Sequence, residues 1–301
     1  NLFVLHPHNK ISNTQRKIMT TIGGGNIFNI AIDGSFDDCQ KIVKDLFNEN
    51  EFRTRINMSG VNSINWARIV CQIVYYFYSY FKLKEESISF SVPTGNFGDI
   101  YAGYVAKKMG LPIKKLIVAT NKNDILQRVI NTGEYKPDRV QPSITPSMDI
   151  QVASNFERLL FYILDENDDN VRSLMEELSS KGSFNLQKKE IEKMKKDFES
   201  IKITDEETQN IINKVFNDHQ FMIDPHTATG FGAVSKFKDL KNIVVLGTAH
   251  PYKFNDTIKK ATGKNLEAPE HFKMDINEKE KFDIISNSNS EVKNYILSKI
   301  Q

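Results

Sequence analysis

Residues 91–99, Ser-Val-Pro-Thr-Gly-Asn-Phe-Gly-Asp, form a segment that could bind a phosphate group. An apolar strand pattern runs to Val92, Gly95 and Gly98 follow, and a helical pattern begins directly afterwards. Glycine allows positive φ angles and lets the backbone approach a ligand closely. The free amides at a helix N-terminus add hydrogen-bond donors and partial positive charge. A tight turn that binds nothing is the competing interpretation, and this short motif alone does not decide between the two.

Asp99 ends this segment, and a phosphate would repel its carboxylate if the side chain pointed inward. We therefore expect Asp99 to cap the following helix, with its carboxylate turned back to the backbone amides. The segment lacks the glycine spacing of a dinucleotide fingerprint and the Gly-Lys-Ser/Thr ending of a nucleotide P-loop.

Thr248 could add a hydroxyl to the same site, because it follows an apolar strand pattern at residues 243–246. Ligands of open α/β sheets collect beyond the carboxyl ends of the strands. If the sheet is parallel, Thr248 and Gly95 should lie at the same edge. The competing interpretation is a threonine that bonds only to its own backbone.

Asn65 and Arg68 lie one turn apart on a long helical pattern and share a face. With Asn62 and Ser63 just before them, they could bind an anion, since a guanidinium beside amides suits a carboxylate or phosphate. Alternatively, the Asn and Ser side chains cap the helix, and Arg68 pairs with a carboxylate. The six histidines are dispersed, with no His-Glu-x-x-His motif and no cysteine pair, so no metal site is predicted.

The elements that must position these residues alternate between strands and helices. This alternation is typical of an α/β fold with a mostly parallel sheet. We expect the helix at 62–81, which is apolar on most of its circumference, to be central. Residues 165–210 predict a polar helical insertion, and the tail after Gly263 is expected to be peripheral. The predicted strands are 2–5, 26–32, 87–92, 115–120 and 243–246, and the other predicted helices are 14–20, 36–47 and 100–109.

The composition narrows the class of protein. The 301 residues are 40% hydrophobic and 26% charged, with a formal net charge of +2, which is typical of a globular protein and gives no electrostatic preference for nucleic acid or a membrane. The longest apolar-rich stretch, 69–81, is too short to span a bilayer. Two cysteines favour a reducing compartment, so we expect a cytoplasmic protein, and a monomer in preference to a higher oligomer.

Seven blocks of sequence, spread over most of the chain, together resemble the threonine synthase family of the bacterial and fungal type. Each block is short, and it is their common order that makes the resemblance specific. The blocks are residues 62–65, 91–99, 119–124, 146–150, 155–158, 224–228 and 247–251.

The resemblance implies the tryptophan-synthase-β-like fold, which is fold type II among pyridoxal-phosphate enzymes. Residues 1–55 would be the remainder of the smaller α/β domain, and 56–301 the large cofactor-binding domain with its insertion near 165–210. The implied reaction converts O-phospho-L-homoserine and water to L-threonine and phosphate, with pyridoxal 5'-phosphate as electron sink.

The resemblance also implies roles for particular residues. Thr248 would donate its hydroxyl to the pyridine nitrogen of the cofactor, and Asp99, at the start of the helix behind the phosphate loop, is counted among the cofactor-binding residues. The amides that hold the cofactor phosphate would be those of Gly95, Asn96, Phe97 and Gly98. The weaker candidates for the substrate pocket are Asn62, Ser63, Asn65 and Arg68.

The chain departs from the family at the Schiff-base lysine. That lysine belongs to a Phe-Lys-Asp-Phe-like motif, followed by a Ser-Gly-Asp-Thr-Gly loop. Neither the sequence Phe-Lys-Asp-Phe nor Ser-Gly-Asp-Thr-Gly occurs here. The resemblance places both upstream of the position that matches Asn1, so no catalytic residue is assigned. We expect a C-terminal portion of the enzyme that is inactive alone. A catalytically inert ligand-binding relative and another fold type II enzyme, such as an amino-acid dehydratase, are the alternatives.

Overall fold

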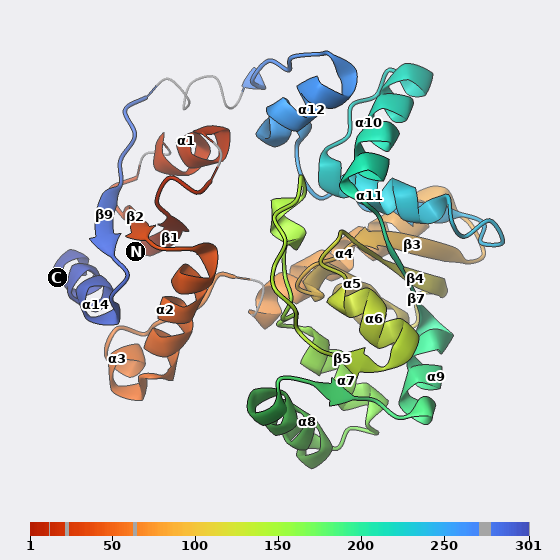
Figure 1. Ribbon diagram of the computed structural model, residues 1–301, viewed down its shortest axis with the longest axis horizontal. Coiled ribbons are helices and arrows are strands. Elements are labelled where there is room, and N and C mark those ends of the chain that lie inside the picture. Colours follow the sequence, from red (N-terminus) through yellow and green to blue (C-terminus); the bar gives the residue numbers. More distant parts are fainter. Residues whose placement is uncertain (12, 22–23, 63–64, 271–277, 301) are drawn as a thin grey trace. The chain divides into compact units, whose positions relative to one another are not determined.

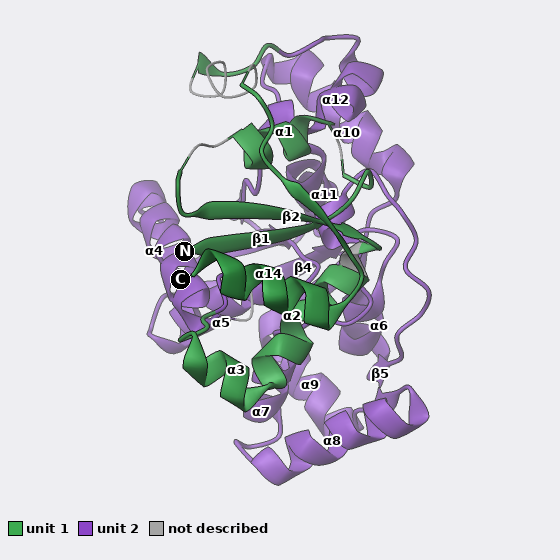
Figure 2. Cartoon of the chain, turned by 90° about the vertical axis from the view of Figure 1, so that its left-hand side faces the viewer, with its two compact units in different colours: residues 1–59, 267–301 green, residues 60–266 purple. Residues whose placement is uncertain are grey.

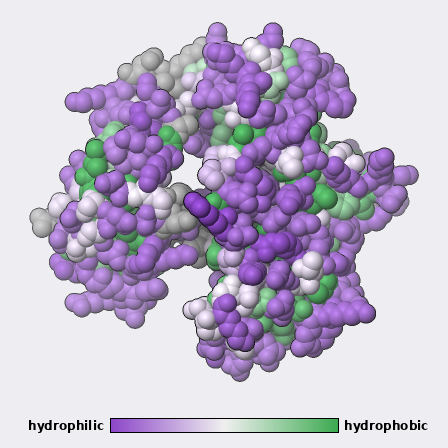
Figure 3. All heavy atoms as spheres, in the orientation of Figure 1, coloured by the Kyte–Doolittle hydropathy of each residue, from purple (hydrophilic) through white to green (hydrophobic). Residues whose placement is uncertain are grey.

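The computed structural model describes residues 1–11, 13–21, 24–62, 65–270 and 278–300. The chain divides into two compact units, each with its own sheet and core (Figure 1, Figure 2). Unit 1 comprises Asn1–Ser59 and Glu267–Gln301, and unit 2 comprises Gly60–Leu266. Among the described residues, no helix combines the length and apolarity needed to cross a membrane. The face shown in Figure 3 is mostly hydrophilic, with hydrophobic residues in smaller areas.

Unit 1 is a parallel sheet covered by helices. The strand order is β1-β2-β9, with β2 in the middle. Ser35 and Asp38 form a reciprocal capping box that starts α2, and Ile42 and Leu46 of that helix are buried in the core. The elements are β1 (Leu2–Pro7), α1 (Asn13–Thr21), β2 (Ile27–Asp33), α2 (Phe36–Asn48), α3 (Asn50–Arg55), β9 (Asp283–Ser286) and α14 (Asn289–Lys299).

The C-terminal tail belongs to unit 1, which corrects the expectation of a peripheral tail attached to the large domain. Strand β9 pairs with β2 in parallel, with Ile32 opposite Ile285. Val292 and Ile296 of α14 are buried in the same core as Ile42. The predicted division into 1–55 and 56–301 therefore differs from the observed units, because strand pairing joins segments that are far apart in sequence.

Unit 2 is built on a four-stranded parallel sheet in the order β7-β4-β3-β8. All six residues of β3 are buried, so both faces of the sheet are covered. The strands are β3 (Ile88–Pro93), β4 (Ile113–Thr120), β7 (Phe198–Lys202) and β8 (Ile243–Val245), and a separate antiparallel pair is formed by β5 (Glu134–Tyr135) and β6 (Phe184–Asn185).

The side chains of β4 alternate between two cores. Leu116 and Val118 face the larger core, while Ile117 and Ala119 pack with Ala233 of α11 on the other side. The helices of unit 2 are α4 (Trp66–Leu83), α5 (Gly98–Lys108), α6 (Ile125–Thr132), α7 (Phe156–Ile163), α8 (Asp168–Lys181), α9 (Lys188–Asp197), α10 (Asp205–His219), α11 (Pro225–Val234) and α12 (Asn255–Thr262), with short 3-10 turns at Pro146–Met148 and Pro251–Phe254.

The α/β class, the parallel sheets and the predicted strands are confirmed, but two predictions about unit 2 are wrong. The segment 165–210 is not wholly helical, because it contains the edge strand β7 of the main sheet. In β7, Phe198 and Ser200 are buried, while Glu199 and Lys202 are more exposed. This polar, half-exposed edge hides the alternating pattern of a strand.

Helix α4 is not central, although its sequence is apolar nearly all round. Its buried residues are Ile69, Ile73 and Tyr76, which form a single face. The opposite side leaves large apolar side chains exposed, at Trp66, Val70, Val74, Tyr78 and Phe81. The apolar residues around the whole circumference had predicted a completely buried helix. Among the described residues, only the face with Ile69, Ile73 and Tyr76 packs into the core of unit 2.

Gly103 of α5 lies against Tyr76 of α4 and Leu116 of β4. A Cβ atom at this position would lie 2.4 Å from the Tyr76 ring and 2.9 Å from the Leu116 side chain. Tyr76 is fully buried and packs edge-on against Phe90, with ring centroids 4.6 Å apart, so its ring has no room to retreat.

We therefore expect Gly103→Ala to lower the free energy of unfolding by about 1–3 kcal/mol through overpacking. In an uncrowded helix the same change would raise the free energy of unfolding by about 1 kcal/mol. The sign of the change therefore shows whether Gly103 is crowded. Urea denaturation measures the change. Gly247→Ala, where an added methyl group meets nothing within 4 Å, is the control in the same unit. Equal stability of the two variants would contradict the packing described.

Candidate functional site

The carboxyl edge of the main sheet brings the predicted phosphate loop and Thr248 together. Strand β3 lies beside β8 in parallel, with Ser91 opposite Val245. The chain leaves β3 after Pro93 toward Gly95, and it leaves β8 after Val245 toward Thr248. Because parallel strands end at the same edge, both segments leave that edge from neighbouring strands. The prediction that they share an edge is confirmed.

The loop that follows β3 is held by the rest of unit 2. The Thr94 amide donates to the carbonyl oxygen of Ala119 at 2.8 Å, which joins the start of the loop to β4. Phe97 has a left-handed backbone (φ 67°) yet is fully buried. Its ring packs against Phe156 and Phe198 at centroid distances of 5.4 and 5.7 Å. Packing of this side chain therefore holds a strained backbone conformation, the kind of conformation that clusters at functional sites.

Three amides of the loop are available to a ligand. The amides of Gly95, Asn96 and Phe97 find no acceptor among the described residues. They stand directly before the N-terminus of α5, where the helix dipole favours an anion. The amide of Gly98 differs from the expectation, because it donates to Oδ1 of Asn96 at 2.8 Å. Gly98 thus stabilises the loop through the Asn96 side chain.

Gly95 is glycine because the backbone passes close to another segment. A Cβ atom there would lie 3.0 Å from Cα of Met148 and 3.2 Å from the carbonyl oxygen of Ser147. The 3-10 turn Pro146–Met148 therefore lies against the loop and leaves no space for a side chain. Any larger residue at this position would push the loop and the turn apart.

Asp99 does not cap α5, and the expectation that it does is wrong. The N-cap is Phe97, without a side-chain cap bond. Tyr76 of α4 donates its hydroxyl to the carbonyl oxygen of Asp99 at 2.8 Å and to Oδ1 at 3.2 Å. The carboxyl group is thus bonded to a residue of α4 and does not turn back to the loop amides. Burial raises the pKa of Asp99 to about 6.

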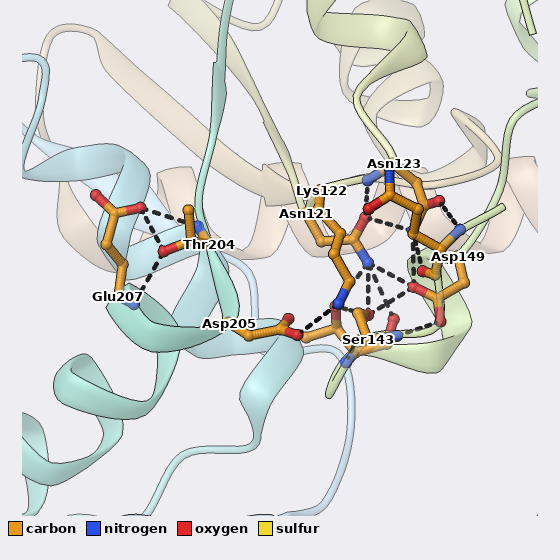
Figure 4. Close-up of polar contacts among 10 residues, drawn as sticks. Asn121, Lys122, Asn123, Ser143, Asp149, Thr204, Asp205 and Glu207 are labelled. Carbon is orange, nitrogen blue, oxygen red and sulfur yellow. Dashed lines mark hydrogen bonds and ion pairs between the residues drawn. The ribbon is translucent and has the colours of Figure 1, made fainter. Parts of the chain in front are cut away.

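The turn Pro146–Met148 is fixed by a cluster of polar side chains that connects it to β4 (Figure 4). Asp149 accepts hydrogen bonds at Oδ1 from Nδ2 of Asn121 (2.8 Å) and of Asn123 (3.0 Å), and from the Ser143 hydroxyl (2.5 Å). The Ser143 amide donates to Oδ2 at 2.9 Å. Asn121 and Asn123 follow β4 directly and are almost fully buried. Asp149 therefore holds the segment 143–149 at the carboxyl edge.

His226 supports the same turn from α11. Its Nε2 accepts from the Ser147 amide at 3.3 Å, and its Nδ1 lies 3.1 Å from Oδ1 of Asp224. Because Nε2 accepts a hydrogen bond, the proton of the neutral imidazole must be on Nδ1. Nδ1 then donates a hydrogen bond to the Asp224 carboxylate. Burial by itself would raise the pKa of Asp224, but hydrogen bonds from His226 and Thr227 lower it overall. Within the described part of the chain, no three His, Cys, Asp or Glu side chains are placed to hold a metal ion.

Thr248 presents its side chain to solvent at this edge. The residue is exposed, and its amide donates to the Thr227 hydroxyl at 3.2 Å. Its own hydroxyl has no hydrogen-bond partner among the described residues. The alternative interpretation, in which the hydroxyl is used by the local backbone, therefore has no support in this structure.

The other predicted residues lie at the start of α4. Asn65 is the N-cap, accepting from the Ala67 amide at 2.9 Å, and Arg68 donates to the carbonyl oxygen of Val61 at 3.0 Å. Their contacts agree with the capping interpretation for Asn65, while Arg68 bonds a carbonyl in place of a carboxylate. Asn62 is exposed at the same segment. Ser63 lies outside the described residues.

The site also contains residues to which the sequence assigned no role. Asn121, Asn123, Asp149 and His226 fell within blocks that suggested the family, but no local pattern pointed to them. The available signal was weak: Asn at 121 and 123 directly follows a buried strand, and a polar residue at that place must find partners.

Asp99 makes a testable contribution to the pH dependence of stability. Its pKa is higher in the folded protein than its ordinary value of 3.8. Between these values the folded state binds more protons than the unfolded state, so stability falls as pH rises from about 4 to 6. One carboxyl contributes at most about 3 kcal/mol over this pH range, and because Asp99 is not completely shielded from solvent we expect a loss of about 1–2 kcal/mol.

We expect Asp99→Asn to lack this loss, because the amide oxygen can still accept from Tyr76 without carrying charge. The stability of the variant relative to the parent should therefore increase between pH 4 and pH 7, as measured by urea denaturation at fixed ionic strength. Asp218→Asn, on the exposed end of α10, controls for general charge effects. If the stabilities of the parent and Asp99→Asn changed in parallel with pH, the claim that burial raises the pKa of Asp99 would be wrong.

Comparison with known proteins gives one consistent result. A family model described as "Threonine synthase, C-terminal" matches residues 227–296. The chain is 43% identical over 300 residues to the threonine synthase of Pseudomonas aeruginosa, covering 98% of this chain and 64% of that protein. It is also 43% identical over 283 residues to the threonine synthase of Saccharomyces cerevisiae, covering 86% of this chain and 55% of that protein.

Solved structures agree. A crystal structure of pyridoxal-phosphate-bound threonine synthase from Brucella melitensis matches with a TM-score of 0.92 and 42% identity, over 99% of this chain and 65% of that one. The structure of the yeast threonine synthase matches with a TM-score of 0.89 and 40% identity, over 99% of this chain and 64% of that one. The chain thus spans somewhat less than two thirds of the length of these relatives.

Proposed function

The chain belongs to the threonine synthase family, and from this we propose that the protein converts O-phospho-L-homoserine and water to L-threonine and phosphate with pyridoxal 5'-phosphate. Membership also establishes the fold class, tryptophan-synthase-β-like, with parallel sheets flanked by helices. One observation supports the cofactor assignment above others: a loop with three unpartnered amides shares a sheet edge with the free hydroxyl of Thr248.

The residues of the loop fit the phosphate of the cofactor. The amides of Gly95, Asn96 and Phe97 would donate to its oxygens, and the N-terminus of α5 would favour its charge. Gly98 would act indirectly, because its amide holds the Asn96 side chain. Asp99 is bonded to Tyr76, so the loop itself carries no carboxylate that would repel the phosphate.

Thr248 would orient the other end of the cofactor by donating its hydroxyl to the ring nitrogen. A neutral hydroxyl donor leaves that nitrogen largely without a proton of its own, unlike a carboxylate partner. When bound, pyridoxal phosphate supplies an electron sink for the substrate amino acid. Thr248 thereby sets how strongly the ring withdraws electrons, while the Thr227 hydroxyl fixes the backbone that carries it.

The substrate would be bound from the start of α4. Arg68 has an exposed side chain beside Asn62 and Asn65. Its guanidinium could donate two parallel hydrogen bonds to one carboxylate or phosphate. Asn65 is occupied as the N-cap, so its contribution would be to position Arg68. We assign Ser63 to the same pocket by its place in the sequence.

We also propose a cytoplasmic monomer. Cys71 is free and exposed, and Cys39 is free and buried, as suits a reducing compartment. The exposed apolar stripe of α4 makes the oligomeric state worth measuring. Sedimentation at two concentrations should give the monomer mass at both, and a mass that rises with concentration would refute the proposal.

The activity is tested with the protein as the cell makes it. Supplied with pyridoxal phosphate and O-phospho-L-homoserine, it should release phosphate and L-threonine in equal amounts, measured by a phosphate assay and amino-acid analysis. Formation of a 2-oxo acid from L-threonine or L-serine, without threonine synthesis, would indicate an amino-acid dehydratase. Cofactor binding with neither reaction would indicate an inert binding protein.

The phosphate loop is tested separately by cofactor affinity. Gly95→Ala would bring a methyl group against Met148 and Ser147 and displace the three free amides. We expect pyridoxal phosphate, measured by equilibrium dialysis, to bind at least about tenfold more weakly, since a tenfold change needs only about 1.4 kcal/mol. Gly25→Ala, where a methyl group meets nothing within 4 Å, should bind like the parent. Unchanged affinity in Gly95→Ala would remove the loop from the cofactor site.

A further inference from the structure

A polar cavity lies at the carboxyl ends of β4 and β7. Its volume is about 410 Å³, large enough for a small metabolite. Lys202 is the last residue of β7, and Lys122 follows β4 by two residues. Arg128 of α6 completes a set of three cationic side chains on its walls. The cavity therefore occupies the edge of the sheet where ligands of open α/β folds collect, two strands away from β8 and Thr248.

Ion pairs hold the cationic side chains of this cavity in place, but not all of their N–H donors have an acceptor. Lys202 pairs with Oδ2 of Asp124 at 2.8 Å, and Arg128 reaches Oδ1 of the same carboxylate at 3.0 Å. Lys122 pairs with Asp205 at 2.8 Å (Figure 4). Each ammonium has three N–H donors and finds a single acceptor among the described residues. Ion pairs therefore fix the positions of the two lysines while most of their donors remain available.

Gln151 adds a neutral hydrogen-bond donor to the walls of the cavity. Its side chain lines the cavity and is only 6% exposed. Oε1 accepts from the Asp138 amide at 3.3 Å and from Nη2 of Arg128 at 3.4 Å, which sets the orientation of the amide group. Nε2 then carries two donors that find no acceptor in the described part of the chain, and it is not among the side-chain atoms sealed off from solvent. An anion that enters the cavity can therefore accept hydrogen bonds from this amide.

We propose that this cavity binds a small oxyanion, a phosphate or carboxylate group carried by a metabolite. Its walls carry donors from Lys122, Lys202, Arg128 and Gln151. Two carboxylates also line it: Asp124, which two cations share, and Asp138, whose Oδ1 accepts from the Arg139 amide at 2.8 Å. Only an acceptor with several lone pairs can satisfy the donors together. The site is separate from the cofactor loop in its chemistry, since it binds through side chains and the loop through backbone amides.

Nitrogen-15 NMR of the Gln151 side chain tests this site directly. Its NH₂ signals are assigned by their disappearance in Gln151→Met. Inorganic phosphate or succinate, titrated at constant ionic strength against sodium chloride, should shift these signals in a saturable way at millimolar concentration. A response to phosphate alone identifies a phosphate site, and a response to succinate alone a carboxylate site. Shifts that chloride reproduces, or no shift with either anion, would overturn the proposal.

Matched variants separate binding from general charge effects. Lys202→Gln and Lys122→Gln should each weaken the titration at Gln151 by tenfold or more. Lys214→Gln removes an equally charged ammonium from an exposed ion pair with Asp218 on α10 and should leave it unchanged. Thermal denaturation verifies that each variant is folded. Equal weakening in Lys214→Gln, or none in both cavity lysine variants, would refute the site.

Discussion

The parallel pairing of β3 with β4 on one side and β8 on the other determines where every candidate functional group lies. In a parallel sheet all strands end at one edge. The strand pairing alone therefore places the loop at Gly95, the Asn121–Asn123 segment and Thr248 at the same edge. The pairing also demands helices on both faces, because β3 is buried along its whole length. One of these, α11, approaches so closely that the Ser91 hydroxyl on β3 donates to the carbonyl oxygen of Gly230 at 2.8 Å.

Strand pairing brings the loops together, but it does not give them shape. That is done by buried polar side chains, chiefly Asn121 and Asn123, whose amides converge on Asp149. Burying any one of these polar side chains without a hydrogen-bond partner would be costly, and here each finds its partner in another. The turn at Ser147 is thereby held from β4 through Asp149 and from α11 through His226. The backbone amides of the neighbouring loop can then stay open to a ligand without collapsing onto an internal acceptor.

The sequence was a sound guide wherever the information is local. The period of the apolar residues identifies β3 and α5, and Gly95 and Gly98 between them identify the loop. Asp99 was misjudged because its partner, Tyr76, lies on another helix, beyond the reach of capping rules. Strand β7 was missed because its outward side chains are polar, and β9 because a four-residue strand has too little pattern. Helix α4 shows a further limit: composition counts apolar residues but does not say which of them meet a core.

Two kinds of anion recognition can be compared at one sheet edge. The loop at Gly95 offers uncharged amides fixed by backbone geometry, so its attraction for a phosphate depends on shape and on the dipole of α5. The cavity at Lys122 and Lys202 offers ammonium groups that ion pairs with Asp205 and Asp124 hold in place. A ligand there would use the donors that these carboxylates leave available, and salt would screen its attraction. The first arrangement suits a group that must be held in one orientation for chemistry. The second suits a molecule whose binding follows its concentration in solution, because salt weakens the attraction of charged side chains at an open edge.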